Sequence, residues 1–290
     1  MADTGIDTGI DTAMATVDLS QALVILDPDR TDLLRELDRT FAGWGSAAGA
    51  REILPPPLYP VSDLEKFDVY TNFPHLALVA SPLQVEGGAA KPVGGSFAAA
   101  DLQPARLGLP HATCYGAYLF HENRRVADTT LITLVNRCFR NEEYYGGLRR
   151  LLSFQMREVV ALGSYEHSQQ VLTAFAERIT AFGRALGLAL DKVAASDPFF
   201  ENDGARALLA KLSPVKFEFQ VAGLAISSVN THRNFFGERC NIQRLDNDEY
   251  AYTSCVAFGL ERWLSVLLDL HDGDARQALE NVRSAAAQVS

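Results

Sequence analysis

The sequence predicts an α+β fold in which one antiparallel sheet is flanked by helices. Two observations indicate this. Strand-like segments follow one another across short turns, and helical segments stand between groups of strands instead of alternating with them. The chain has 290 residues, 48% of them hydrophobic and 21% charged, which is enough to bury an ordinary core. We expect a disordered tail over residues 1–17 and a single domain over residues 18–290.

The first half predicts one helix, a proline-rich linker and several strands. Apolar residues recur at helical spacing over residues 28–44, where Asp27 or Asp29 would cap the helix and Gly45 would end it. Four prolines exclude a helix from residues 53–60. Residues 86–104 are rich in glycine and alanine and predict a loop. The strands expected in this half cover residues 72–85, 112–120 and 130–139.

The second half predicts a hairpin, a long helix, two strands and terminal helices. The hairpin spans residues 137–163 and turns at a Gly-Gly pair. The long helix is expected over residues 168–195, with Ser168 as its cap. The remaining elements are a short helix at 204–212, strands at 215–221 and 223–229, and helices at 256–271 and 274–287.

Charge and cysteine content exclude several classes of protein. The formal net charge is −10, which disfavours a large nucleic-acid-binding face because phosphate backbones are bound mainly by Lys and Arg. Neither a membrane span nor a signal peptide is recognisable, so we expect a cytoplasmic protein. The four cysteines are far apart in the sequence, and each taken alone predicts a reduced, buried thiol. They are Cys114, Cys138, Cys240 and Cys255.

The hairpin carries charge where a buried strand should be apolar. One interpretation is a cross-strand salt bridge between Arg140 and Glu158 on a solvated face. A second is a nucleotide site, because Phe154 lies on the same second strand and Arg262 lies within an apolar segment near the C-terminus. Arginines bind phosphates, and an aromatic ring offers a surface to a base. Arg157 points to the opposite face and predicts a solvated or cross-strand-paired charge.

Several phrases in this order resemble class II aminoacyl-tRNA synthetases. RCFRNE (137–142) and FQMREVVALGS (154–164) are similar to motif 2 of that class, SCVAFGLERW (254–263) to motif 3, and ILPPPLYP (53–60) to motif 1, the dimer element. The resemblance is strongest to atypical, zinc-dependent seryl-tRNA synthetases and to their truncated homologues, the amino acid:[carrier protein] ligases. Further phrases that carry it are FPHL (73–76), CYGAYLFHEN (114–123), DPFF (197–200) and ISSVNTHRNFFGER (226–239).

The resemblance implies a homodimer with a six-stranded antiparallel sheet, and a site for ATP. Arg140 would bind the α-phosphate, Glu142 would orient the adenine, and Arg150 would reach the terminal phosphates. Phe154 would stack on the adenine, opposite Arg262. The alternatives are a core aromatic for Phe154 and a salt bridge to Glu261 or a neighbour for Arg262. Arg140 and Arg262 are the implied catalytic residues. Leu151, Lys216, Ser227 and Ser228 complete the implied ATP site, although Lys216 is equally well read as a solvated strand-end lysine.

The same resemblance implies zinc bound by Cys114, Glu158 and Cys255, with Glu158 also contacting the substrate. Three protein ligands leave one tetrahedral position open, which the α-amino group of a small amino acid would fill. Magnesium would accompany ATP, but Ala225 stands where the synthetases usually carry a carboxylate. Glu218 or Glu249 could replace it. Cys138 and Cys240 keep the interpretation of plain thiols.

The implied activity is the activation of glycine or alanine, with serine a lesser candidate, and its transfer to the phosphopantetheine thiol of a carrier protein. No transfer RNA is expected, because the chain is acidic and only about 50 residues precede the motif 1 region. A non-catalytic, synthetase-like module and a tRNA-charging enzyme with a partner remain alternatives. Basic residues that could meet an acidic carrier, or be ordinary solvated charges, are Arg149, Arg178, Arg184 and Lys192.

Overall fold

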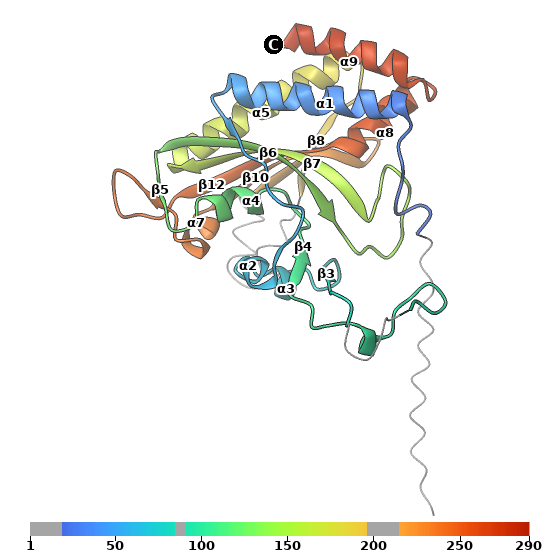
Figure 1. Cartoon of the computed structure of the whole chain (residues 1–290). Helices are drawn as coiled ribbons and strands as arrows, with labels where there is room; N and C mark the ends of the chain where they lie inside the picture. Colours follow the sequence, from blue (N-terminus) through green and yellow to red (C-terminus); the bar gives the residue numbers. More distant parts are fainter. Residues whose placement is uncertain (1–18, 85–90, 196–214, 290) are drawn as a thin grey trace, which may run out of the picture.

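A seven-stranded sheet runs through the described part of the chain, which comprises residues 19–84, 91–195 and 215–289 of a computed structural model (Figure 1). Strand β1 pairs with β6 in parallel, and the other neighbours are antiparallel. The implied six-stranded antiparallel sheet is therefore wrong in detail. In spatial order the strands are β1 (Arg51–Glu52), β6 (Thr129–Phe139), β7 (Ser153–Gly163), β12 (Tyr252–Gly259), β10 (Leu224–Arg233), β9 (Lys216–Val221) and β8 (Asp191–Ala195).

Helices α1 (Pro28–Ala47), α5 (Tyr165–Leu186) and α8 (Leu260–Leu270) lie against one face of this sheet, and α9 (Ala275–Val289) packs on the outside of them (Figure 1). Their apolar sides bury an aromatic cluster against the strands, in which the rings of Phe41 and Phe258 stack with centroids 4.2 Å apart. Trp44, Phe182 and Trp263 pack around that pair. This cluster is the main core, and it makes the sheet a rigid platform.

The opposite face carries shorter elements and leaves part of the sheet open for a site. A second core lies there, in which Tyr118 and Phe236 stack with centroids 4.1 Å apart. The helices on this side are α2 (Val61–Glu65), α3 (Val69–Asn72), α4 (Tyr115–Phe120), α7 (Phe235–Arg239) and the 3₁₀ turn η1 (Ala99–Asp101). Two small sheets join β2 (Tyr59–Pro60), β4 (Leu107–Leu109) and β3 (Leu78–Ala80), and β11 (Gln243–Arg244) with β5 (Arg125–Val126).

The long amphipathic helix is confirmed but lies earlier than expected. Ser164, not Ser168, is its N-cap, and the Ser164 hydroxyl accepts a hydrogen bond from the backbone N–H of His167 at 3.1 Å. Gly187 ends the helix with a φ of +82°, a left-handed conformation that glycine adopts without strain. Residues 191–195 then form β8, so Lys192 lies on an edge strand and not on the helix.

Three other expected elements are wrong in type or in bounds. Residues 115–120 form helix α4 instead of a strand. The sequence did not predict it, because residues 115–118 are all buried and their run carries no diagnostic period. The segment expected to be a helix from residue 256 remains strand β12 up to Gly259, and α8 begins at Leu260. The strand expected over residues 72–85 shrinks to β3.

Other expectations stand or lie outside the described residues. The helix over residues 28–44 is confirmed as α1, which Asp27 caps by accepting from the backbone N–H of Arg30 at 2.9 Å. Gly45 does not end it, because α1 continues to Ala47. The charged hairpin is confirmed as β6 and β7, and the helix expected at 274–287 as α9. The predicted tail at 1–17 and short helix at 204–212 lie outside the described residues.

Of the two alternatives predicted for Arg157, a solvated charge is wrong and a paired charge is confirmed. Arg157 is only 2% exposed, because α1 packs over its face of the sheet. Asp38 on α1 binds it at both carboxylate oxygens, with distances of 2.7 Å to Nε and 2.9 Å to Nη2. Glu52 on β1 accepts from Nη1 at 2.6 Å. The guanidinium therefore joins the helix layer and the edge strand to β7.

Candidate functional site

Every second side chain of β7 points to the open face of the sheet. Phe154, Met156 and Glu158 point to this face, whereas Arg157 and Val159 point to the helix layer. Strands β12, β10 and β9 continue the surface, and the turn between β6 and β7 forms its rim. A pocket and a buried thiol–carboxylate cluster lie next to each other on this face.

The pocket is rich in positive charge. Five cationic side chains line it, Arg149 among them, together with the three carboxylates of Glu142, Glu218 and Glu261. The structure brings every residue predicted to contact ATP to this pocket. Those residues are Arg140, Glu142, Arg150, Leu151, Phe154, Lys216, Ser227, Ser228 and Arg262.

Arg140 is held at the pocket by main-chain and aromatic contacts. Its Nε and Nη2 donate to the carbonyl oxygen of His111 at 3.3 and 3.1 Å. Its guanidinium also lies 5.1 Å from the ring centroid of Phe154. The alternative salt bridge between Arg140 and Glu158 is wrong, because Glu158 lies deeper and accepts from the backbone N–H of Thr113 at 3.0 Å.

Arg262 is fixed in a similar way on the other side. It donates to the carbonyl oxygens of Arg149 and Ala225, each at 3.0 Å. The predicted alternative of a salt bridge to Glu261 is wrong, because Glu261 accepts from the backbone N–H of Gln155 at 2.8 Å. Burial and the nearby charge of Arg140 lower the pKa of Arg262 to about 10. Burial and a neighbouring positive charge destabilise the charged guanidinium, so an anionic ligand at this position would stabilise it.

The rim and the floor of the pocket hold two ion pairs. Arg150 Nη1 lies 2.9 Å from the Glu142 carboxylate at the rim. On the floor, Lys216 Nζ lies 3.2 Å from Glu218 Oε1. Both cations keep solvent contact, so both pairs can open when a stronger anion arrives.

The side chains of Ser227 and Ser228 point to opposite faces of the sheet. Ser228 faces the pocket side of the sheet, where it is the cross-strand partner of Glu218. The Ser227 hydroxyl accepts a hydrogen bond from the Trp263 indole N–H at 3.0 Å, which directs it to the helix layer. Glu249, the second carboxylate considered for magnesium, pairs with Arg244 outside the pocket.

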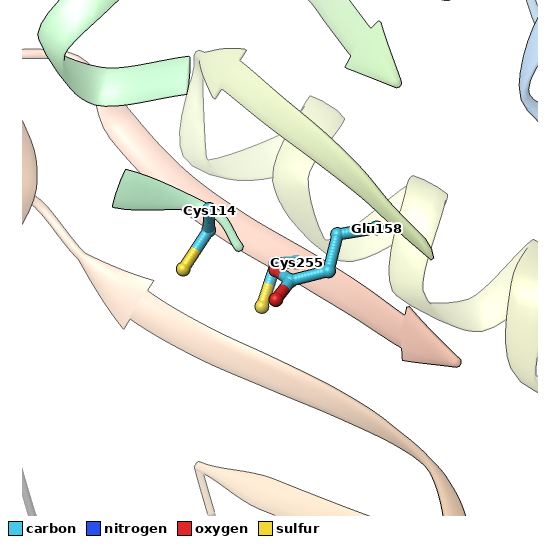
Figure 2. Close-up of side chains that lie close together, drawn as sticks. All are labelled: Cys114, Glu158 and Cys255. Atoms are coloured by element: carbon cyan, nitrogen blue, oxygen red, sulfur yellow. The ribbon is translucent and has the colours of Figure 1, made fainter. Parts of the chain in front are cut away.

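Cys114, Glu158 and Cys255 converge from three separate parts of the chain (Figure 2). The ligand atoms that they offer all lie within 4.8 Å of one another, and all three side chains are buried. Cys114 immediately precedes α4, Glu158 lies on β7, and Cys255 lies on the neighbouring strand β12. The register of β7 and β12 brings two of them together. Glu158 is paired with Ala257, and Cys255 lies two residues before Ala257 on the same side of β12.

The electrostatics of this cluster suit a cation. Burial raises the pKa of Glu158, and its Oε2 is buried without a hydrogen-bond partner. The hydrogen bond to Cys255, burial and the Glu158 carboxylate raise the pKa of the Cys114 thiol well above its usual value. The hydrogen bond with Cys114 lowers the pKa of the Cys255 thiol, but burial and the Glu158 carboxylate raise it by more, so the pKa lies above its usual value. Two sulfurs and one carboxylate form a donor set that zinc favours, and a cation would satisfy the orphaned oxygen.

Three neighbours of this cluster were not predicted. The Asn230 amide donates to Cys255 Sγ at 3.3 Å, and His232 Nε2 lies 3.7 Å from the same sulfur. Thr113 fixes Glu158 through its backbone. The signal in the sequence was the polar alternation of Ser228, Asn230 and His232 along a strand that is otherwise buried. Cys138 and Cys240 are buried free thiols, as expected.

The cluster and the cationic pocket are adjacent. Met156 and Ala257 line the pocket, and each lies two residues from a member of the cluster on the same strand face. Such neighbours are about 7 Å apart along a strand. A small molecule could therefore contact the cluster with one end and reach the pocket with the other.

The known proteins similar to this chain are carrier-protein ligases and aminoacyl-tRNA synthetases. No protein-family model matches the sequence. The chain is 31% identical over 241 residues to amino acid–[acyl-carrier-protein] ligase 1 of Bradyrhizobium diazoefficiens, covering 78% of this chain and 73% of the relative. It belongs to this ligase family. Ligase 2 of the same organism is 30% identical over 233 residues, covering 76% of this chain and 69% of that protein.

Solved structures place the family's fold among class II synthetases. Seryl-tRNA synthetase of M. kandleri, solved with A. aeolicus tRNASec, superposes with a TM-score of 0.70 at 18% identity, over 90% of this chain. Cytoplasmic serine-tRNA ligase of Naegleria fowleri, solved with AMP, gives 0.66 at 13% identity, over 89% of this chain. This chain spans 56% and 60% of those chains. The class II synthetase-like fold predicted from the sequence is thereby confirmed. None of the described helices has the length and apolar character that crossing a membrane requires.

Proposed function

We propose that the protein activates a small amino acid with ATP and transfers it to the phosphopantetheine thiol of a carrier protein. The observation that carries the proposal is the buried Cys114, Glu158 and Cys255 cluster next to a cationic pocket. The membership in a family of ligases named for acyl carrier proteins supports it. We expect glycine or alanine as substrate, with serine a lesser candidate.

In the first step a carboxylate oxygen of the amino acid attacks the α-phosphorus of ATP. The bond from that phosphorus to the bridging oxygen breaks, and pyrophosphate leaves. No side chain acts as nucleophile, so the residues contribute position and charge. Arg140 and Arg262, already held by carbonyl oxygens, bind phosphate oxygens, while Arg150 leaves Glu142 for the terminal phosphates. Phe154 stacks on the adenine, and Glu142, Leu151, Lys216 and Ser228 complete the side-chain contacts. Ser227 lines the pocket, but its hydroxyl is turned to Trp263.

In the second step the thiolate of the carrier's prosthetic arm attacks the acyl carbon, and AMP leaves with its phosphate oxygen. Cys114, Glu158 and Cys255 would hold zinc, which when bound supplies an open coordination position for the neutral amino group. Glu158 stays fixed by Thr113 while its second oxygen faces that site.

The proposal extends to a cytoplasmic homodimer built from one domain over residues 18–290, with magnesium accompanying ATP. A basic surface would meet the acidic carrier. Of its candidates, Arg149 is paired with Asp269 beside the pocket. Arg178, Arg184 and Lys192 lie far along α5 and β8.

The test is mass spectrometry of a phosphopantetheinylated carrier protein after incubation with ATP and glycine, alanine or serine. Parallel reactions contain bulk transfer RNA in place of the carrier. A thioester on the carrier that depends on ATP supports the proposal. Charging of the RNA alone would instead identify a tRNA-charging enzyme. Pyrophosphate exchange without either acceptor separates a catalytic protein from a non-catalytic binding module, which would show none.

A further inference from the structure

The first described residues form a short segment that lies beside the β6–β7 turn (Figure 1). We call residues 19–25 the strap; they precede Asp27, which caps α1. The strap begins with a tight turn, in which the backbone N–H groups of Ala22 and Leu23 both donate to the carbonyl oxygen of Leu19, at 3.1 and 3.2 Å. These hydrogen bonds give the strap a defined conformation.

Ala22 is the residue by which the strap is attached to the hairpin. Its side chain is 0% exposed, although Ile25 on the same strap is 98% exposed. The Ala22 carbonyl oxygen accepts a hydrogen bond from the backbone N–H of Leu152 at 3.0 Å. The Gln21 Oε1 atom lies 3.6 Å from the point where a Cβ would stand on Gly147. The strap therefore contacts both the turn of the hairpin and the residue that precedes β7.

Leu152 connects the strap to the nucleotide pocket. Its carbonyl oxygen accepts from the backbone N–H of Arg140 at 2.9 Å, just beyond the last residue pair of β6 and β7. Both backbone groups of Leu152 are thereby bonded, one to the strap and one to a predicted phosphate-binding arginine. Arg150 and Leu151 line the same pocket and directly precede Leu152 in the chain.

A second set of contacts holds the same turn to α8. The Arg149 carbonyl oxygen accepts from Arg262 Nε at 3.0 Å, and the Arg149 guanidinium pairs with Asp269. If the strap were displaced, the turn would stay attached at Arg149 and lose its anchor at Leu152. The pocket would then have to be ordered by its ligand, and ordering on binding weakens affinity.

We infer that the strap is a positioning element for ATP, which holds Leu152 and through it Arg140 and Arg150 in the geometry that the phosphates require. The inference rests on the proposed function and concerns its first step. Ala22 is a positioning residue, because it lies outside the pocket lining and acts through the main chain of Leu152. The buried thiol–carboxylate cluster shares none of these contacts, so amino-acid binding is independent of the strap.

The test is amino-acid-dependent pyrophosphate exchange at varied ATP, with Ala22→Glu as the main variant. A glutamate does not fit the buried position of Ala22 and forces the strap away from Leu152. We expect the KM for ATP to rise by about five- to tenfold, as the loss of one hydrogen bond predicts, and the KM for the amino acid to stay unchanged. Ala22→Gly keeps the carbonyl oxygen and the fit, so it should behave as wild type. Ile25→Ser is the matched control on the exposed side of the strap.

Two further measurements separate positioning from folding. A chain that begins at residue 27 lacks the strap but keeps the cap of α1, whereas a chain that begins at residue 19 keeps both. Only the first should show the raised KM for ATP. Amide hydrogen exchange over residues 146–152 should be about tenfold faster in Ala22→Glu, while exchange over β12 stays at the wild-type rate.

An unchanged KM for ATP in Ala22→Glu overturns the inference. An equal rise of both KM values also overturns it, because that result would indicate a general loss of structure. A wild-type protein that shows no pyrophosphate exchange overturns the proposed function instead. In that case the hydrogen-exchange comparison still decides whether the strap holds the hairpin, and equal rates over residues 146–152 would count against it.

Discussion

Arg157 and Glu158 are consecutive residues on β7, are both almost fully buried, and serve opposite faces of the sheet. Arg157 ties α1 and β1 to the strand through Asp38 and Glu52. Glu158 faces Cys114 and Cys255 on the other side. One charged dipeptide therefore stabilises the scaffold with its first residue and builds the site with its second.

The Arg157 network predicts unequal costs for its two carboxylates. Asp38→Ala removes a bidentate partner from a buried guanidinium, and we expect it to lower the free energy of unfolding by about 3 kcal/mol. Glu52→Ala removes one contact from a more exposed side chain, and about 1 kcal/mol is expected. Urea denaturation followed by circular dichroism measures both. Equal costs would contradict the bidentate role of Asp38.

The cysteine and carboxylate cluster predicts metal content. Purified protein should contain about one zinc per chain by elemental analysis, and prolonged dialysis against a strong chelator should remove it together with amino-acid-dependent pyrophosphate exchange. Cys114→Ser, Glu158→Gln and Cys255→Ser should lose the metal. Cys138→Ser and Cys240→Ser serve as controls and should retain it, because these thiols lie outside the cluster. Retention of zinc by all three cluster variants would disprove this assignment.

Replacing the pocket arginines should lower the rate of catalysis more than it lowers the stability of the fold. Arg140→Ala and Arg262→Ala should each lower the kcat of pyrophosphate exchange by about 10²- to 10³-fold, because each removes a positioned charge from the transferring phosphate. Phe154→Ala should instead raise the KM for ATP by about tenfold through lost stacking. Arg184→Ala, on α5 away from the pocket, is the control and should leave both constants unchanged.

Burial of His111 predicts a dependence of stability on pH. Burial and the nearby Arg140 lower its pKa from 6.5 to about 3, so between these values the unfolded chain binds a proton that the folded protein does not. Stability then falls as pH falls, by about 1.4 kcal/mol per pH unit for this group. His111→Gln should flatten the dependence by that amount between about pH 6 and pH 4 in denaturation series. The same slope in wild type and variant would refute the assignment.

The residues assigned to the site from the sequence come together in the fold, whereas several of the elements that carry them were predicted with the wrong type or bounds. Every predicted ATP contact lines one pocket, and the three predicted zinc ligands converge, since motif phrases preserve spacing on strands whose register is constrained. The helix α4 was missed because Tyr115, Gly116, Ala117 and Tyr118 are all buried, which removes the period that separates helix from strand.

The predictions of where α8 begins and where α5 ends were wrong for related reasons. Strand β12 is buried on both faces, so its apolar run continues without a break into the helix. Leu190 follows Gly187 at a spacing that still looks helical, although the glycine ends α5. The burial of Arg157 could not be predicted from the sequence, because tertiary packing decides whether its face of the sheet is covered by water or by α1. Asn230 and His232 were visible only as polar alternation in a strand.

The three residues of the buried cluster leave the ribosome at very different times. Cys114 and Glu158 emerge long before Cys255, and Cys255 belongs to a strand that is inserted between β7 and β10. A nascent chain that has not yet delivered β12 lacks one sulfur and also the neighbour that orders β7. The cluster is therefore complete only once β12 has been synthesised, and a nascent chain that stops before β12 would lack the proposed zinc site.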